Sequence, residues 1–281
     1  MNKNELLLAA KIDTRWHYRD QLNLAQLLAE VALDSVTSWP VANHLIRSQL
    51  EFFPGVLTEP QPPGEQMISI LDDDYPLALA EIYEPPILLF YRGQRDLLDA
   101  HKIGIVGARQ CTTYSQHCLR RLIPEFVGKQ LVTVSGLAMG VDQLVHQETL
   151  LARGKTIAVI GNGLDVVYPE QNRALQQVIT QHGLLLSEYL PGTPPRRFHF
   201  PQRNRIIAGL SEAVLVTEAR RRSGSLITAN LALQENRNVY AIPGNILSEL
   251  SEGTNQLIQA GATPVLCASD ILTDFQFNSA G

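Results

Sequence analysis

Arginines gather in one stretch of this chain. Residues 191–225 contain seven arginines and two glutamates, a net charge of +5 in a protein whose formal net charge is −5. Small turn residues lie among them, namely Asn204 between Arg203 and Arg205, and Ser223-Gly224-Ser225 directly after Arg222. Guanidinium groups and the backbone N–H groups of such turns both bind anions, phosphate above all. The stretch therefore predicts a phosphate-binding site.

Glycines and small hydroxyl residues also follow most of the apolar runs that we expect to be strands. Gly107-Ala108-Arg109 follows residues 103–106, and Ser135-Gly136-Leu137-Ala138-Met139-Gly140 follows residues 131–134. Gly161-Asn162-Gly163 follows residues 156–160. Ligands of open parallel sheets bind beyond the carboxyl ends of the strands. Because these ends share one edge, we expect the turns to form one long rim.

Arg109 is the arginine whose position is most informative. It comes directly after a buried strand, where an unpaired guanidinium would be costly. It needs either an internal carboxylate or an incoming phosphate, and we favour phosphate. An alternative to phosphate binding is open for Arg220, Arg221 and Arg222, which could form the solvated face of a loop. Of Arg203 and Arg205, one can have a structural role instead of binding a ligand.

The elements that must position these residues alternate between strands and helices. The expected strands are short apolar runs typical of strands buried on both faces, at residues 103–106, 131–134, 156–160, 184–186, 213–216, 239–242 and 265–266. Helical segments separate them, at residues 114–127, 139–152, 170–181, 203–210, 224–235 and 252–260. This alternation predicts an α/β fold with a doubly wound, mostly parallel sheet and right-handed crossovers.

The chain before this sheet has a different character. Residues 6–10, 22–33 and 41–52 have the apolar periodicity of helices, so we expect a small all-α N-terminal domain over residues 1–53. Residues 54–64 hold four prolines and two glycines and are expected to be a linker. The main domain then covers residues 65–281.

Several classes of protein have no support. Three cysteines without Cys-x-x-Cys spacing argue against a disulfide framework. Asp142 and His146 lie four apart on an expected helix, but without further ligands they suggest a hydrogen-bonded pair and no metal site. No cofactor is expected. No apolar run approaches the roughly 18 residues of a membrane span, and the N-terminus lacks a signal peptide, so we expect a cytoplasmic protein without membrane contact.

Three enzyme motifs are incomplete or missing. Gly154-Lys155-Thr156 is similar to the end of a P-loop, but Thr149 stands where the first glycine is needed. Gly161-Asn162-Gly163 begins a dinucleotide fingerprint, but Val166 takes the place of the third glycine. A Gly-x-Ser-x-Gly nucleophile elbow is absent. The rim is therefore expected to bind and not to break bonds.

Taken together, the motifs resemble the bacterial DNA-processing protein A family (DprA, also called Smf). The similarity runs from about Tyr75 to Gly261. It rests on the segments Gly104–Arg109, Val134–Asp142, Thr156–Asp165, Tyr168–Asn172, Ser187–Tyr189, Phe200–Leu210, Arg222–Thr228 and Ala241–Gly244.

The resemblance implies an extended Rossmann-like fold and a function without catalysis. Such a protein binds and protects incoming single-stranded DNA and loads the RecA recombinase onto it in natural transformation and homologous recombination. The partners implied are single-stranded DNA, RecA, a second copy in a homodimer and, as a further candidate, the single-stranded-DNA-binding protein.

The motif match places phosphate contacts at Gly107, Arg109, Ser135, Gly136, Met139, Gly224 and Ser225. The rim adds Ala108, Gly161, Asn162, Arg203, Asn204, Arg205 and Arg222 as DNA-binding candidates. Two departures matter. The family's Gly-Ser-Arg is Gly-Ala-Arg here, which removes a hydroxyl group at Ala108. Glu170 stands where some relatives have a basic residue, and Arg173 could compensate for it. Phe198, Phe200 and Tyr189 are candidates for base stacking.

Two other interpretations stay open. The first is a nucleotide phosphoribohydrolase on a similar scaffold, but Leu231 occupies the place of that family's catalytic glutamate. The second is an interaction scaffold with a vestigial phosphate site, which would show no salt-dependent affinity for DNA.

Overall fold

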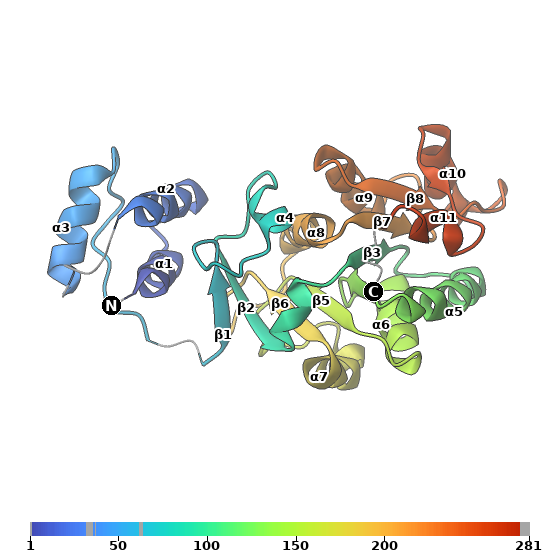
Figure 1. Cartoon of the computed structure of the whole chain (residues 1–281), viewed down its shortest axis with the longest axis horizontal. Coiled ribbons are helices and arrows are strands. Elements are labelled where there is room, and N and C mark those ends of the chain that lie inside the picture. The colour runs from blue at the N-terminus through green and yellow to red at the C-terminus, as the bar shows by residue number, and fades with distance from the viewer. Residues whose placement is uncertain (1, 32–35, 37, 62–63, 276–281) are drawn as a thin grey trace, which may run out of the picture. The chain divides into compact units, whose positions relative to one another are not determined.

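The computed structural model describes residues 2–31, 36, 38–61 and 64–275. The chain forms two compact units, Met1–Phe90 and Tyr91–Gly281 (Figure 1). The domain boundaries expected at residues 53 and 64 divide the first unit further, and they stay predictions.

The first unit begins with three helices and continues with short elements. Its elements are α1 (Lys3–Ile12), α2 (Tyr18–Glu30), α3 (Trp39–Gln49), β1 (Gln66–Ser69), α4 (Leu77–Ala80) and β2 (Leu88–Gly93), which crosses the boundary of the units. Asn2 and Glu5 form a capping box that starts α1. Asn4 donates a hydrogen bond to Asp72 at 3.0 Å, so α1 is joined to the segment that follows the proline-rich stretch.

The second unit alternates strands and helices as the sequence predicts. Its elements are η1 (Arg95–Leu98), β3 (Lys102–Val106), α5 (Thr113–Gly128), β4 (Val132–Ser135), α6 (Val141–Leu151), β5 (Thr156–Ile160), η2 (Glu170–Asn172), α7 (Arg173–His182), β6 (Leu184–Ser187), α8 (His199–Leu210), β7 (Ala213–Val216), α9 (Gly224–Gln234), β8 (Asn238–Ala241), η3 (Glu249–Ser251), α10 (Glu252–Gln259), β9 (Thr263–Pro264) and α11 (Ser269–Leu272).

The strands of the second unit lie in the order β6-β5-β4-β3-β7-β8-β9. Each neighbouring pair is parallel. From β3 the chain steps outward through β4, β5 and β6, and it then returns to β7 on the other side of β3. The strand order therefore reverses between β3 and β7, where open α/β sheets bind their ligands. The predicted α/β class and the doubly wound sheet are confirmed.

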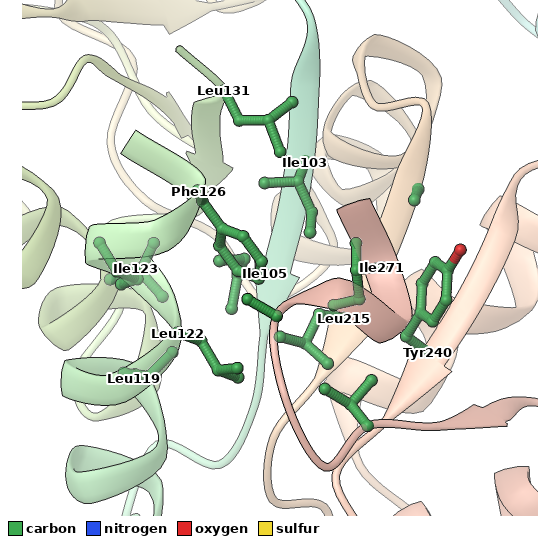
Figure 2. Close-up of a cluster of buried hydrophobic side chains, with 14 of the residues drawn as sticks. Ile103, Ile105, Leu119, Leu122, Ile123, Phe126, Leu131, Leu215, Tyr240 and Ile271 are labelled. Carbon is green, nitrogen blue, oxygen red and sulfur yellow. The ribbon is translucent and has the colours of Figure 1, made fainter. Parts of the chain in front are cut away.

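Helices cover both faces of this sheet (Figure 1). On one face, Ile103 and Ile105 of β3 pack with Leu119, Ile123 and Phe126 of α5 in a buried apolar cluster that also takes side chains from β7, β8 and α11 (Figure 2). Helices α8 and α9 pack together against the other face. This cover on both faces explains why β3, β4, β5, β6 and β7 are buried throughout and mostly apolar.

The sequence-based expectations were wrong at several short elements. β9 is Thr263–Pro264, whereas we expected a strand at 265–266. β1, β2 and α4 were not expected at all. β1 and β9 lack the continuous apolar run that marks the other strands, and pairing with a neighbour decides their bounds. The helix expected over 41–52 ends at Gln49, since Leu50 is extended.

Candidate nucleic-acid interface

An open pocket of about 790 Å³ lies at the point where the strand order reverses. We call it the phosphate pocket. The β3–α5 loop, the start of α8 and the β7–α9 loop supply most of its wall. Five arginines take part in its lining, Arg109, Arg197, Arg203, Arg220 and Arg222. Asp142 is the one carboxylate among the described lining residues. The pocket is therefore strongly basic.

Arg109 is exposed, and its guanidinium lies over the ring of Phe200, with 5.3 Å between the guanidinium carbon and the ring centroid. Among the described residues, no carboxylate lies within ion-pair distance of this guanidinium. The expected cost of an unpaired guanidinium after the buried strand does not arise, because the Arg109 side chain is exposed and lines the phosphate pocket. An exposed arginine on an aromatic ring is held in place and still has N–H groups for a ligand.

Arg203 has a different environment, although it lines the same pocket. It is buried, and its guanidinium donates hydrogen bonds to the carbonyl groups of Gly136 and Val159. A Cβ atom at residue 136 would lie 2.3 Å from Arg203 Nη1, so the close approach requires glycine. Arg203 thus joins the ends of β4 and β5 and adds positive charge to the floor of the pocket.

Asp142 is buried in the first turn of α6. The backbone N–H of Ala138 donates to Asp142 Oδ2 at 3.4 Å. Burial raises the pKa of Asp142, and the positive charges of Arg203 and Arg109 act against that shift. The hydrogen bond expected between Asp142 and His146 is not formed, since His146 Nδ1 lies 2.7 Å from Thr156 Oγ1. No cluster of metal-binding side chains occurs in the part of the chain that the structure describes.

The N-terminus of α9 opens into the phosphate pocket. Gly224 and Ser225 form its first turn and line the pocket. The N-cap residue Ser223 makes no capping hydrogen bond, and its hydroxyl lies 3.1 Å from that of Ser225. Asn204 donates to the carbonyl of Gly224 at 3.3 Å and so joins α8 to this turn. The first N–H groups of a helix have no partner within the helix, and the helix dipole favours an anion there.

A smaller pocket of about 40 Å³ lies beside the phosphate pocket, at the ends of β4 and β5. Both pockets share Arg109, Ala138, Tyr168 and Phe200. The rings of Tyr168 and Phe200 are 5.7 Å apart. The smaller pocket adds Gly136, Met139, Gly161 and Asn162. The rim expected from the sequence is therefore one continuous surface over the ends of β3, β4, β5 and β7.

Two predicted site residues do not line either pocket. Ser135 is buried, and its hydroxyl donates to the carbonyl of Ile105 at 2.7 Å. Arg205 pairs with Glu188 at 2.7 Å, and both side chains are largely buried. The other predicted residues line the two pockets, namely Gly107, Ala108, Arg109, Gly136, Met139, Gly161, Asn162, Arg203, Asn204, Arg222, Gly224 and Ser225. Their contact with DNA stays a prediction.

The aromatic candidates also divide. Phe200 lines both pockets, whereas Tyr189 stacks on His199 with 4.0 Å between ring centroids. Tyr168, which our prediction did not place in the site, takes a position beside Phe200. Its position in the segment after β5 could have indicated this role, but in the Tyr168–Asn172 motif we considered only Glu170 as a possible DNA contact. Glu170 and Arg173 form an exposed ion pair at 2.6 Å, so Arg173 is not a free substitute for a basic residue at position 170.

None of the described helices has both the length and the apolar character that crossing a membrane requires. At the rim, four arginines of residues 191–225 line the phosphate pocket together with Arg109.

Comparisons with known proteins agree with this geometry. DNA processing protein DprA of Streptococcus pneumoniae is 52% identical over 209 residues, which cover 74% of this chain and 74% of the relative. That of Bacillus subtilis is 38% identical over 273 residues, which cover 95% of this chain and 91% of the relative.

Solved structures point the same way. The S. pneumoniae DprA structure has a TM-score of 0.75 and 41% identity, and the match covers 98% of this chain and 94% of that one. A structure of DNA processing protein A from Helicobacter pylori, described for its single-stranded DNA binding mode, has a TM-score of 0.68 and 31% identity, with coverage of 77% and 100%. The family model of DNA recombination-mediator protein A matches residues 66–276. The chain belongs to the DNA recombination-mediator protein A family, whose curated members are named DprA or Smf.

Proposed function

We propose that this protein binds single-stranded DNA by its backbone, with a phosphate group in the phosphate pocket. The observation that carries the proposal is Arg109, which lies over Phe200 without a carboxylate partner among the described residues. The N-terminus of α9 faces the same space. A fixed guanidinium and free helix N–H groups are the two standard devices for holding a phosphate oxygen.

The surroundings of the pocket favour a single strand over a duplex. Phe200 and Tyr168 offer ring faces on which unpaired bases can stack, and Phe198 is 56% exposed nearby in sequence. Stacking on aromatic rings accepts every base, so the expected binding has little sequence preference. The formal net charge of −5 gives the rest of the surface little attraction for duplex DNA.

The wider role follows from family membership. We infer that the protein protects single-stranded DNA and loads the RecA recombinase onto it, and that it acts as a homodimer in the cytoplasm. The S. pneumoniae and B. subtilis relatives, both named for DNA processing, support this placement. The single-stranded-DNA-binding protein is a further expected partner, because it covers the same substrate.

A function without catalysis fits the residues at hand. Leu231, which stands where the phosphoribohydrolases have a catalytic glutamate, lies on α9. Asp142 is held by the N–H of Ala138 in a basic surrounding, without a second carboxylate among the described lining residues. Acid–base hydrolysis normally needs a pair of groups in contrasting environments. We therefore propose that the pocket binds its ligand unchanged.

The proposal is tested by competition between DNA forms. Labelled oligothymidylate bound to the protein is challenged with unlabelled single strand or with duplex of the same length. We expect the single strand to displace the label at far lower concentration. Equal competition by the duplex would reject the preference for single strands. A second measurement follows the ATPase activity of RecA on single-stranded DNA that carries the single-stranded-DNA-binding protein; faster onset with this protein is expected, and an unchanged lag would reject RecA loading.

A further inference from the structure

A second pocket lies at the same edge of the sheet, at the ends of β7 and β8. Its volume is about 460 Å³. We call it the β8 pocket. It is lined by Thr112, Tyr114, Glu218, Pro243, Gly244, Asn245, Ser248 and Ser251. Pro243 and Gly244 lie in one of the motif segments, but none of the lining residues is a predicted DNA contact, so the chemistry of this pocket needs its own account.

The β8 pocket adjoins the phosphate pocket along two loops. In the β3–α5 loop, Gln110 lines the phosphate pocket and Thr112 lines the β8 pocket. In the β7–α9 loop, Arg220 lines the former and Glu218 the latter. Two residues of extended chain span at most about 7 Å, which is roughly two base steps of ~3.4 Å. The two pockets are therefore neighbours along the sheet edge, and one strand can enter both.

The charge of the β8 pocket excludes a phosphate. Neither lysine nor arginine is among the described residues that line it. Glu218 lies at its base and is 2% exposed. Its carboxylate accepts hydrogen bonds from the N–H and the hydroxyl of Thr112 at 2.8 and 2.7 Å and from Ser115 at 2.8 Å. A carboxylate in a lining without lysine or arginine disfavours an anion, so the pocket suits an uncharged group.

The β8 pocket also has an aromatic face. Tyr114 lies in the first turn of α5 and is 42% exposed. Its hydroxyl donates to the carbonyl of Pro243 at 2.6 Å, which fixes the direction of the ring. Beside it, Asn245 Oδ1 accepts from the N–H of Leu247 at 2.9 Å in a tight turn that leaves Ile246 and Leu247 86% and 89% exposed.

We propose that the β8 pocket holds a nucleobase of the strand whose backbone is bound in the phosphate pocket, stacked on Tyr114. The inference rests on the proposed single-strand binding and adds the path of the strand, which then runs along the sheet edge between β5 and β8. The hydroxyl group of Ser248 and the amide group of Asn245 line the pocket and face polar edges of the base.

The test combines a protein variant with a gap in the DNA. The shortest labelled oligothymidylate that binds with full affinity carries one abasic site, moved position by position, because a strand that just fills the site cannot shift its register. For the wild type, we expect loss of the base to weaken binding by about tenfold at the position that enters the β8 pocket, the size of one stacked base. Tyr114→Ala should weaken binding of the intact strand equally and should lose the effect of the gap at that position.

Two further variants complete the design. Tyr114→Phe keeps the ring and should retain most of the affinity, which separates stacking from the Pro243 hydrogen bond. Leu151→Ala is the control, since Leu151 is 75% exposed and lies at the C-terminal end of α6, away from the carboxyl ends of the strands. The base pocket is rejected if Tyr114→Ala binds the intact strand as tightly as the wild type does. It is also rejected if, at every position of the abasic site, the affinity lost through the abasic site adds fully to the affinity lost through Tyr114→Ala. Wild-type protein that binds no single strand would instead reject the proposed function itself.

Discussion

At the scale of single residues, three arginines predicted to bind DNA have three different partners. Arg109 lies over Phe200, Arg203 donates to backbone carbonyls, and Arg205 pairs with Glu188. Sequence motifs identified all three as candidates and could not separate them, because Glu188 is 17 residues from Arg205 and Gly136 is 67 residues from Arg203. Partners at such distances come from the tertiary fold. Only Arg109 of the three keeps an exposed guanidinium for a ligand.

Asp142 gives a prediction at this scale. Its carboxyl group shares the phosphate pocket with Arg109 and Arg203, so its charged form repels a bound phosphate. Replacement by asparagine should strengthen single-strand binding by up to about fivefold, the size of a screened charge interaction of ~1 kcal/mol. Fluorescence anisotropy of a labelled oligothymidylate measures the change.

The pH dependence of this effect has a defined sign. A bound phosphate favours the protonated carboxyl group, whose pKa burial already raises, so wild-type affinity should increase as the pH falls toward that pKa. The affinity of Asp142→Asn should vary less over the same range. Weaker binding by the variant, at an unchanged melting temperature, would show that the carboxylate supports the site instead of opposing the ligand.

At the scale of elements, α6 is anchored to the sheet by a buried polar network. His146 Nδ1 lies 2.7 Å from Thr156 Oγ1, and Thr133 Oγ1 lies 2.9 Å from both Thr156 Oγ1 and Thr149 Oγ1. His146 Nε2 is buried without a hydrogen-bond partner within the described chain. Burial, together with the charge of Arg203, lowers the pKa of His146 to about 3. The network therefore requires a neutral imidazole.

This network predicts how stability depends on pH. The unfolded chain binds a proton at His146 near pH 6.5, and the folded protein does not until about pH 3. The stabilisation is complete above about pH 6.5 and decreases as the pH falls through this range. Between neutral pH and about pH 5.5, the free energy of unfolding should decrease by ~1 kcal/mol more for the wild type than for His146→Gln. Urea unfolding at neutral pH and at about pH 5.5 measures this free energy for both proteins. An identical decrease in the two proteins would contradict a neutral buried His146.

Replacement by alanine should affect stability differently at two glycines in neighbouring turns. A Cβ atom at residue 107 would lie 2.5 Å from Thr217 Oγ1 and 2.6 Å from Val141 Cγ2, whereas one at residue 224 would meet no atom within 4 Å. Gly107→Ala should destabilise the fold by about 1–3 kcal/mol, the usual range for overpacking. Gly224→Ala should leave the melting temperature nearly unchanged. Thermal unfolding of both variants decides this, and equal stability would show that the β3–α5 turn can shift.

At the scale of the whole molecule, the sequence predicts the doubly wound sheet because apolar strands buried on both faces leave few other folds. It also predicts the edge where the ligand binds, since strand ends followed by glycine and arginine must meet there. It does not predict β1, β2 and the two-residue β9, whose bounds depend on pairing with distant segments. The turn Pro243-Gly244-Asn245 was visible in the sequence as the end of a strand, but the other groups of the β8 pocket, such as Tyr114 of α5 and Ser248, come from distant segments and could not be assigned to it.

The central claim, that a phosphate of single-stranded DNA binds at Arg109, is tested most directly by the salt dependence of binding. Anisotropy titrations with labelled oligothymidylate between about 50 and 200 mM salt compare the wild type with Arg109→Ala. The control is Arg121→Ala, which removes the same charge from an exposed position on α5. We expect Arg109→Ala to lose about 1–3 kcal/mol of binding free energy and about 0.7 of the slope of log K against log salt, with Arg121→Ala close to the wild type. Unchanged affinity and slope in a folded Arg109→Ala protein would contradict the account.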